Sequence, residues 1–368
     1  AGLEVRQDGP VRVYAAANGA PSPTGRFLAT WGDGEIEAQF GQALDEFQPD
    51  VVHIQHMMGQ PKGIFDRVRA AGLPVYITLL DFWWVCANAQ LLTNYSQEIC
   101  DGPDRWINCA RCVIARSGRT AGWAALPALP PLLGWRSRML QEIMAYADAL
   151  LAPCPFVRDW YVAHGAPADR TIVLPLGIDA PSPADDKPPV RRVDEPLRVL
   201  YVGGIAWQKG LHVLLEAARG VTGPLAVQIA GDLDAESQYG SRLHGLADAR
   251  VCFLGRLDRA AVWAAMRDAH LIAVPSLWYE TYSLLTHEAF AVKRPVFASN
   301  LGALTDAVRD GVDGLLLPPG DVNAWRAALQ RAVDKPEMLS DLGANARPPA
   351  TIEEIAARTL GLYLGGKR

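Results

Sequence analysis

Short runs of Val, Ile and Leu alternate with helical segments along most of this chain, and no other feature constrains its fold as strongly. The runs lie at 51–54, 75–79, 150–153, 199–202, 225–229, 271–275 and 295–299. Few polar residues interrupt them, as expected for strands that are buried on both faces of a sheet. Segments with helical periodicity separate them, for example at 210–218, 260–268 and 323–333. This alternation predicts parallel βαβ units and therefore an α/β fold.

The length of 368 residues predicts two such domains. The segment 181–196 carries five prolines and many charges without an apolar period, so we expect it to be a linker. The predicted domains are then 1–180 and 197–350. A helical pattern at 351–368 follows, and we expect this C-terminal helix to pack back towards the first domain.

The first domain opens unusually. A strand is expected at 11–14 and a helix at 35–46, but no glycine-rich strand-to-helix turn lies between them. Doubly wound domains normally begin with such a turn. We therefore predict that the domain lacks its first strand and glycine-rich loop, and we expect the natural protein to be longer.

Composition excludes several classes of protein. The net charge is −5 and the pI is near 5.8, which argues against a nucleic-acid-binding protein. No run of 18 apolar residues predicts a transmembrane helix, and the first 30 residues do not resemble a signal peptide. The expected location is the cytoplasm.

The second predicted domain opens with a possible phosphate site. A strand ends near Val202, the pair Gly203-Gly204 makes a close turn, and Lys209 precedes a helix. Ligands bind outside the carboxyl ends of strands in such sheets, where this lysine can reach a phosphate. It can equally be a solvated surface lysine. The turn at 255–257 follows another strand and could contact a nucleotide base, or could be a plain βα turn.

Two glutamates eight positions apart, Glu280 and Glu288, follow the strand at 271–275. A helix is expected to begin near Ser283. Glu280 would then lie just before its N-terminus, and Glu288 would lie about one and a half turns into the helix. The free N–H groups and partial positive charge at a helix N-terminus attract phosphate. A carboxylate nearby can hold a hydroxyl group. Taken alone, this spacing is also common in ordinary helices.

The order of these motifs resembles one family. Across 197–330 the chain carries GG-x4-KG, AGD, FLGR, PS-x-WYE-x7-E and DGVDGLLLPPGD, similar to the retaining glycosyltransferases of family 4. The first domain is more loosely similar, at 50–56, 75–86, 152–165 and 173–179. The resemblance implies the GT-B fold, with two Rossmann-like doubly wound domains facing a central cleft. It implies a hexosyltransferase of class EC 2.4 that uses a UDP- or GDP-sugar and needs no metal for its chemistry. The implied acceptor is a glycan, a lipid-linked molecule or a small molecule.

The resemblance also implies residue roles. Lys209 would hold the donor diphosphate, Glu288 would accept hydrogen bonds from the ribose, and Glu280 and Asp81 would be the catalytic residues. The other implied donor-binding positions are Gly204, Arg256, Leu257, Thr281, Tyr282, Ser283 and Leu284. Arg256 and Leu257 would line the base pocket, and the amides near the start of the helix would cradle the diphosphate.

Three departures from the family pattern keep other functions open. Leu80 stands where the family often has histidine, Gly204 stands where many members carry arginine, and the opening strand and loop are not found. His53 or His56 could lie near the position of the missing histidine. The main alternative is a catalytically silent GT-B protein that binds nucleotide sugars or acts as an assembly partner. An epimerase or phosphorylase with the same fold is a further alternative.

Four of the six cysteines cluster in the first domain, at Cys86, Cys100, Cys109 and Cys112. A C-x2-C pair with two more cysteines close before it fits a structural four-cysteine zinc site. An iron–sulfur cluster would use the same ligands, and independent thiols are the third possibility. Cys154 and Cys252 fall in strand contexts and are expected in the core.

The segment 121–135 is apolar and rich in proline, and arginines follow it at 136 and 138. We interpret it as a hydrophobic connection that covers the first sheet. A peripheral contact with the inner face of a membrane is the alternative.

Overall fold

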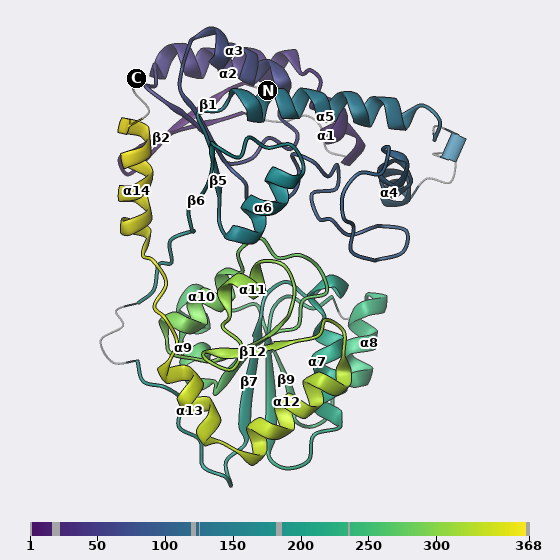
Figure 1. Cartoon of the computed structure of the whole chain (residues 1–368), viewed down its shortest axis with the longest axis vertical. Helices are drawn as coiled ribbons and strands as arrows, with labels where there is room; N and C mark the ends of the chain where they lie inside the picture. Colours follow the sequence, from purple (N-terminus) through teal and green to yellow (C-terminus); the bar gives the residue numbers. More distant parts are fainter. Residues whose placement is uncertain are drawn as a thin grey trace. The chain divides into compact units, whose positions relative to one another are not determined.

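The computed structural model describes residues 2–16, 23–118, 123–124, 126–181, 186–234 and 236–365 (Figure 1). They form two compact α/β units, each described here by itself. Unit 1 comprises Ala1–Pro153, Val157–Leu174 and Thr359–Arg368, and unit 2 comprises Cys154–Phe156 and Pro175–Arg358.

Unit 2 contains a parallel sheet of six strands. They are β7 (Leu197–Val202), β8 (Leu225–Ala230), β9 (Val251–Gly255), β10 (Leu271–Val274), β11 (Val296–Ser299) and β12 (Gly314–Leu317). Their spatial order is β12-β11-β10-β7-β8-β9, so the direction of winding reverses between β7 and β10. This is the doubly wound order of Rossmann-like folds, in which ligands bind at the point of reversal.

Helices cover both faces of this sheet (Figure 1). One face packs against α7 (Leu211–Arg219), α8 (Gln238–Leu246), α12 (Val322–Asp334) and α13 (Glu337–Ala344). The other packs against α9 (Arg259–Asp268), α10 (Leu284–Ala291) and α11 (Ala303–Ala307). Along β7, Val199 and Tyr201 belong to the first core and Leu200 belongs to the second. Burial on both faces explains why the strand sequences show no polar alternation.

The expected location of Cys252 is wrong. This residue lies on β9, and its side chain is exposed. The strand β9 is at the edge of the sheet, with a neighbour on one side only. An edge strand is covered less completely than a central one, so an apolar strand sequence does not guarantee burial of each position. Cys154, in contrast, is buried as expected.

The described part of the predicted linker packs on unit 2. Asp186 accepts hydrogen bonds of 2.7 and 2.9 Å from the guanidinium of Arg267 on α9. Arg191 is buried and donates to the carbonyl oxygens of Ala332 and Val333 at the end of α12. Positions 182–185 of the linker lie outside the described residues.

Unit 1 contains a parallel sheet of four strands in sequential order. They are β3 (Val52–Ile54), β4 (Val75–Thr78), β5 (Ala149–Ala152) and β6 (Thr171–Val173). The accompanying helices are α1 (Pro23–Ala29), α2 (Gly34–Phe47), α3 (Lys62–Ala70), α4 (Ile107–Ser117), α5 (Leu129–Tyr146) and α6 (Pro155–Ala163). The strand expected at 11–14 is present as β2 (Val11–Ala15). It pairs antiparallel with β1 (Glu4–Asp8) in a separate hairpin, so the described parallel sheet begins at β3.

The last turns of α14 (Ile352–Gly365) pack on β3 and β4 of unit 1. The hydroxyl of Tyr363 lies 2.5 Å from Nδ1 of His53, and the hydroxyl of Tyr76 donates to the carbonyl of Leu362 at 2.8 Å. The rings of Tyr76 and Tyr363 lie 4.9 Å apart. Residues 366–368 of the predicted helix lie outside the described residues.

The apolar segment at 121–135 enters α5 at Leu129, whereas positions 121, 122 and 125 lie outside the described residues. Trp135 stacks on Trp31 of unit 1 at 5.7 Å, and both Trp123 and Trp135 are about half exposed. The guanidinium of Arg136, the next residue, is fully buried instead.

Candidate functional site

The carboxyl ends of β7 and β10 lie side by side at the reversal point of unit 2, and the predicted donor residues follow them. The loop after β7 carries Gly203, Gly204 and a short helical turn, Trp207–Lys209. The loop after β10 carries Ser276 to Glu280. The amide of Leu277 donates to the carbonyl of Gln208 at 2.8 Å, which joins the two loops directly.

Lys209 and Glu280 meet in this place. The ammonium of Lys209 lies 2.8 Å from Oε1 of Glu280 and 4.9 Å from the centre of the Trp278 ring. The hydroxyl of Ser276 and the indole N–H of Trp278 donate to the same carboxylate oxygen at 2.7 and 3.0 Å. Three donors on one oxygen hold the carboxylate in a single orientation. The sequence motifs did not single out Ser276 and Trp278 as partners, although both lie within four residues of Glu280.

Gly210 makes this approach possible. Its φ is +69°, and a Cβ at this position would lie 1.9 Å from the carbonyl oxygen of Pro275. A side chain here would therefore push apart the two loops that carry Lys209 and Glu280.

We expect Gly210→Ala to destabilise the protein by about 1–3 kcal/mol, because both the backbone conformation and the contact with Pro275 become strained. Gly204→Ala is the matched control, since a Cβ at Gly204 meets no atom within 4 Å. Urea unfolding of both variants measures the difference. Equal stability of the two variants would contradict this account of the loop.

The N-terminus of α10 adjoins these residues in sequence. Ser283 adopts a left-handed conformation with φ 57° and directs its hydroxyl to Oγ1 of Thr286 at 2.8 Å rather than capping the helix. Tyr282 is buried, donates to the carbonyl of Leu176 at 2.9 Å and stacks on His287. The carbonyl of Thr281 accepts from the Cys154 thiol, and Leu284 is about half exposed. The positive end of the helix is thus left without a side-chain cap from Ser283.

Glu288 lies in the second turn of α10 and is buried. Its Oε1 accepts a hydrogen bond of 2.5 Å from Arg259, at the start of α9. Arg259 also stacks over the ring of Trp263, with its central carbon 4.6 Å from the ring centre. We did not predict Arg259 from the sequence. Its position just after the FLGR motif was the only sequence feature that could have indicated a place in the site.

The predicted base-pocket residues lie at the end of β9. Arg256 is strongly exposed, with its nearest carboxylate at Asp232, 3.8 Å away. Leu257 is half-buried. Gly204 is exposed, so the local backbone leaves room for the larger side chain that the family pattern often has there.

Unit 1 has a polar pair at the carboxyl ends of β3 and β4. Nε2 of His56 lies 2.8 Å from Oδ2 of Asp81, and the amide of Trp83 donates to Oδ1 of Asp81 at 2.9 Å. The amide of Met58 donates to Nδ1 of His56 at 2.8 Å. Because Nδ1 accepts, a neutral His56 carries its proton on Nε2 and donates it to Asp81. The histidine beside Asp81 is therefore His56, although the preceding residue is Leu80.

His53 has a different environment. Its Nε2 lies 2.7 Å from the hydroxyl of Thr78, its Nδ1 contacts Tyr363, and burial lowers its pKa. These contacts tie β3 to β4 and to α14.

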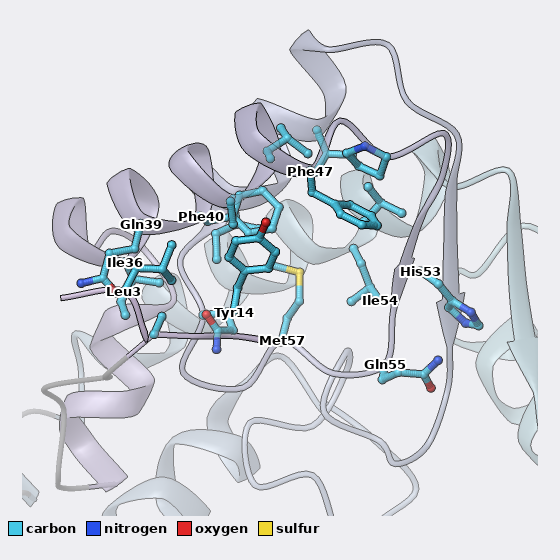
Figure 2. Close-up of a pocket in the computed structure, with 18 of the residues that line it drawn as sticks. Leu3, Tyr14, Ile36, Gln39, Phe40, Phe47, His53, Ile54, Gln55 and Met57 are labelled. Atoms are coloured by element: carbon cyan, nitrogen blue, oxygen red, sulfur yellow. The ribbon is translucent and has the colours of Figure 1, made fainter. Parts of the chain in front are cut away.

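A cavity of about 720 Å³ lies in unit 1 between β2, α2 and β3. Figure 2 shows Tyr14, Phe40, Phe47, Ile54 and Met57 around it, so its lining is mainly apolar. His56 also lines this cavity. The hollow therefore reaches His56, the hydrogen-bond partner of Asp81.

The four clustered cysteines surround one small cavity in unit 1. Burial raises the pKa of Cys109 to about 12 and also raises the pKa values of Cys100 and Cys112. Within the described residues, no three His, Cys, Asp or Glu side chains are gathered closely enough to hold a metal ion as they stand.

Two family models together match almost the whole chain. The one described as a glycosyl transferase 4-like domain matches residues 2–177, and the one described as glycosyl transferases group 1 matches residues 184–348. The chain belongs to the glycosyltransferases of the GT-B fold. The predicted fold class is thereby confirmed.

Curated glycosyltransferases of several kinds are similar to this chain. The D-rhamnosyltransferase WbpZ of Pseudomonas aeruginosa is 30% identical over 186 residues, which are 48% of this chain and 48% of that protein. A D-inositol 3-phosphate glycosyltransferase of Xylanimonas cellulosilytica is 26% identical over 89% of this chain and 87% of its own length. For several other curated relatives, the match spans only about half of their length.

Solved structures of glycosyltransferases share the fold. Sucrose-phosphate synthase from Thermosynechococcus elongatus superposes with a TM-score of 0.73 at 21% identity, over 98% of this chain and 85% of that one. HepE from Anabaena, solved in complex with UDP and glucose, gives a TM-score of 0.62 at 17% identity, over 88% and 81%. Among the described helices of this chain, none has the length and apolar character needed to cross a bilayer.

Proposed function

We propose that this protein transfers a sugar from a nucleotide-sugar donor to an acceptor, and that the donor binds at the carboxyl ends of β7 and β10 in unit 2. The observation that carries the proposal is the contact between Lys209 and Glu280 at the reversal point of the sheet. The uncapped start of α10 follows three residues after Glu280. A cation and a helix N-terminus together suit a diphosphate.

The proposed chemistry uses these groups to stabilise the leaving nucleoside diphosphate. As the bond from the sugar to the phosphate breaks, negative charge grows on the phosphate, where Lys209 and the α10 amides offset it. Glu280 holds the donor sugar and is oriented by Ser276 and Trp278. We propose that this charge stabilisation needs no metal ion and that the sugar is transferred with retention of its anomeric configuration.

Glu288 is the proposed ribose ligand, and the turn with Arg256 and Leu257 is the proposed base site. HepE, a structural neighbour, was solved with UDP and with UDP-glucose, which supports a UDP-sugar as the first donor to test. A GDP-sugar is the second donor to test.

The experiment is a panel of UDP-, GDP-, ADP- and TDP-sugars, measured by thermal shift and by slow hydrolysis of the donor. We expect one nucleotide to raise the melting temperature and one of its sugars to be hydrolysed. No binding of any nucleotide would contradict the proposal. NMR of the transfer product tests retention, and turnover in EDTA tests the metal-independent chemistry.

A catalytically silent nucleotide-sugar-binding protein is the second candidate. Its support is Gly204 in place of an arginine and a described parallel sheet of unit 1 that begins at β3. The pair of His56 and Asp81 favours the active enzyme instead, because it supplies a histidine that Leu80 does not. Binding without turnover on every donor and acceptor would identify the silent form.

The acceptor is proposed to bind to unit 1, with an apolar portion in the cavity of about 720 Å³. A glycan, a lipid-linked molecule and a small molecule remain the candidate acceptors. The cytoplasmic location and the peripheral membrane contact stay predictions. Co-sedimentation with anionic vesicles tests the contact, for which the exposed Trp123 and Trp135 are the relevant side chains.

A further inference from the structure

Four cysteines from three segments of unit 1 line the same cavity. Cys86 follows the turn after β4, Cys100 follows the bridge between Leu92 and Ile99, and Cys109 and Cys112 lie on α4. The cavity measures about 20 Å³. A volume of roughly 10–15 Å³ already accommodates one water-sized particle. The four side chains thus surround space for a single ion.

The spacing on α4 presents two of these thiols together. Residues three apart on a helix lie on the same face, so Cys109 and Cys112 both line the cavity. Cys86 and Cys100 complete a set of four sulfur ligands, which is the usual number in a structural zinc site.

Amide groups surround the sulfur of Cys112. The side-chain amide of Asn88 donates to it at 2.9 Å, and the backbone and side-chain amides of Asn94 donate at 3.2 and 3.4 Å. The side-chain amide of Asn108 reaches the sulfur of Cys100 at 3.7 Å. Metal-bound sulfurs commonly accept hydrogen bonds from such N–H partners. In the structure, the Cys100 thiol donates to the carbonyl of Gly102, and the Cys112 thiol donates to the carbonyl of Leu92.

A buried cation lies beside the cluster. Arg136 is 1% exposed, donates to the carbonyl of Trp83 at 2.7 Å and stacks over the Trp83 ring. Its Nε has no hydrogen-bond partner among the described residues, and it forms no ion pair with their carboxylates within 4.0 Å. The groups that favour its charge include Cys86, Cys109 and the carboxylate of Asp81. A buried cation with no carboxylate in direct contact is costly. A zinc ion with four thiolates carries a net charge of 2−, which Arg136 would partly balance.

The loop that carries these cysteines is held in an unfavourable backbone conformation. Between 89 and 106 five non-glycine residues have positive φ angles, namely Ala89, Leu91, Gln97, Arg105 and Trp106. Such conformations persist only where the surroundings enforce them. A metal ion that joins both ends of the loop would supply this constraint.

We propose that Cys86, Cys100, Cys109 and Cys112 bind one Zn²⁺ as thiolates in a tetrahedral structural site. Binding converts four thiols to thiolates and releases four protons, and it leaves no ligand position open for a substrate. The ion draws the sulfurs inward to separations of about 3.8 Å, as Zn–S bonds of about 2.3 Å require.

This site would influence the position of the polar pair, His56 and Asp81, through backbone hydrogen bonds. The loop begins directly after Asp81, and the amide of Cys86 donates to the carbonyl of Phe82 at 2.7 Å. The amide of Phe82 in turn donates to the carbonyl of Ala89 at 3.2 Å. The zinc site would therefore hold the backbone that follows Asp81, and it would take no part in the transfer.

The test is elemental analysis of the full chain purified without chelator. We expect about one zinc per chain, and we expect Cys109→Ser and Cys112→Ser to lower the zinc content by tenfold or more. Cys252→Ser is the matched control, because this thiol is exposed on β9 and should leave the zinc content unchanged. Zinc far below one per chain would overturn the proposal, as would iron with acid-labile sulfide. The panel of sugar nucleotides tests the transferase proposal separately, so neither result would contradict that proposal.

Cobalt substitution gives a readout that does not depend on a variant folding. Unfolded protein exchanged with Co²⁺ and refolded should show the sulfur-to-cobalt charge-transfer bands of a tetrahedral thiolate site. Absence of these bands in refolded protein would also overturn the proposal. Arg136→Gln is expected to weaken zinc binding about 10-fold, measured by competition with a chromogenic chelator, because it removes the neighbouring charge.

Discussion

Lys209→Met is expected to lower the turnover of the nucleotide-sugar donor by about 10²–10³-fold, because it removes the cation that we propose stabilises the leaving diphosphate. Methionine keeps a similar length and fills the place above the Trp278 ring. The Lys209–Glu280 pair is partly exposed, so its loss should change the free energy of unfolding by at most about 1 kcal/mol. The measurement is kcat for hydrolysis or transfer with the donor that the nucleotide panel identifies.

Lys335→Met is the matched control for this variant. Lys335 is exposed and follows α12, away from the carboxyl ends of β7 and β10. We expect its turnover to stay within twofold of the native protein. If Lys209→Met also kept turnover within a few-fold of native, the diphosphate role of Lys209 would be wrong.

Glu288→Gln is expected to weaken nucleotide binding by about 10- to 100-fold. A hydrogen bond to a charged group contributes about 1.5–3 kcal/mol, and each 1.4 kcal/mol corresponds to tenfold in Kd. Glutamine retains the size of the side chain but loses the charge that holds Arg259 and that we propose binds the ribose hydroxyls. Calorimetric titration with UDP and GDP measures the change.

Two further variants separate a ribose contact from a general loss of structure. Glu337→Gln alters an exposed carboxylate in the first turn of α13 and should leave Kd unchanged. Arg259→Ala removes the partner that orients Glu288 and should weaken binding less than Glu288→Gln does. Unchanged affinity in Glu288→Gln would rule out the ribose role.

Much of the fold was predictable because the signals are local. Strands β4, β5, β10 and β11 were expected within a residue or two of their bounds, since uninterrupted Val, Ile and Leu runs bounded by turns are typical of buried parallel strands. The helices α7, α9 and α12 were predicted from apolar periodicity in the same way. Cys252 shows the limit of this reasoning, because exposure depends on whether a strand is at the edge of its sheet.

The candidate site could be proposed from the sequence as a set of residues but not as a set of contacts. Lys209 and Glu280 are 71 residues apart, His56 and Asp81 are 25 apart, and Arg259 and Glu288 are 29 apart. Nothing in the local pattern around Leu80 indicates that His56, rather than His53, lies beside Asp81. The four cysteines likewise come from three segments whose meeting depends on how the loop after β4 folds back.

The sequence by itself therefore determined the α/β class and the two-part organisation. It also determined the order in which Gly203-Gly204, Lys209, Glu280 and Glu288 follow successive strands. Apolar periodicity and turn residues are local signals that span a few neighbouring positions, so they can be recognised in a single sequence. Only the tertiary structure decided that β7 lies next to β10, because strand order depends on packing across the whole sheet. Because these two strands are neighbours, Lys209 contacts Glu280. The motif after β7 and the motif after β10 therefore form one candidate donor site.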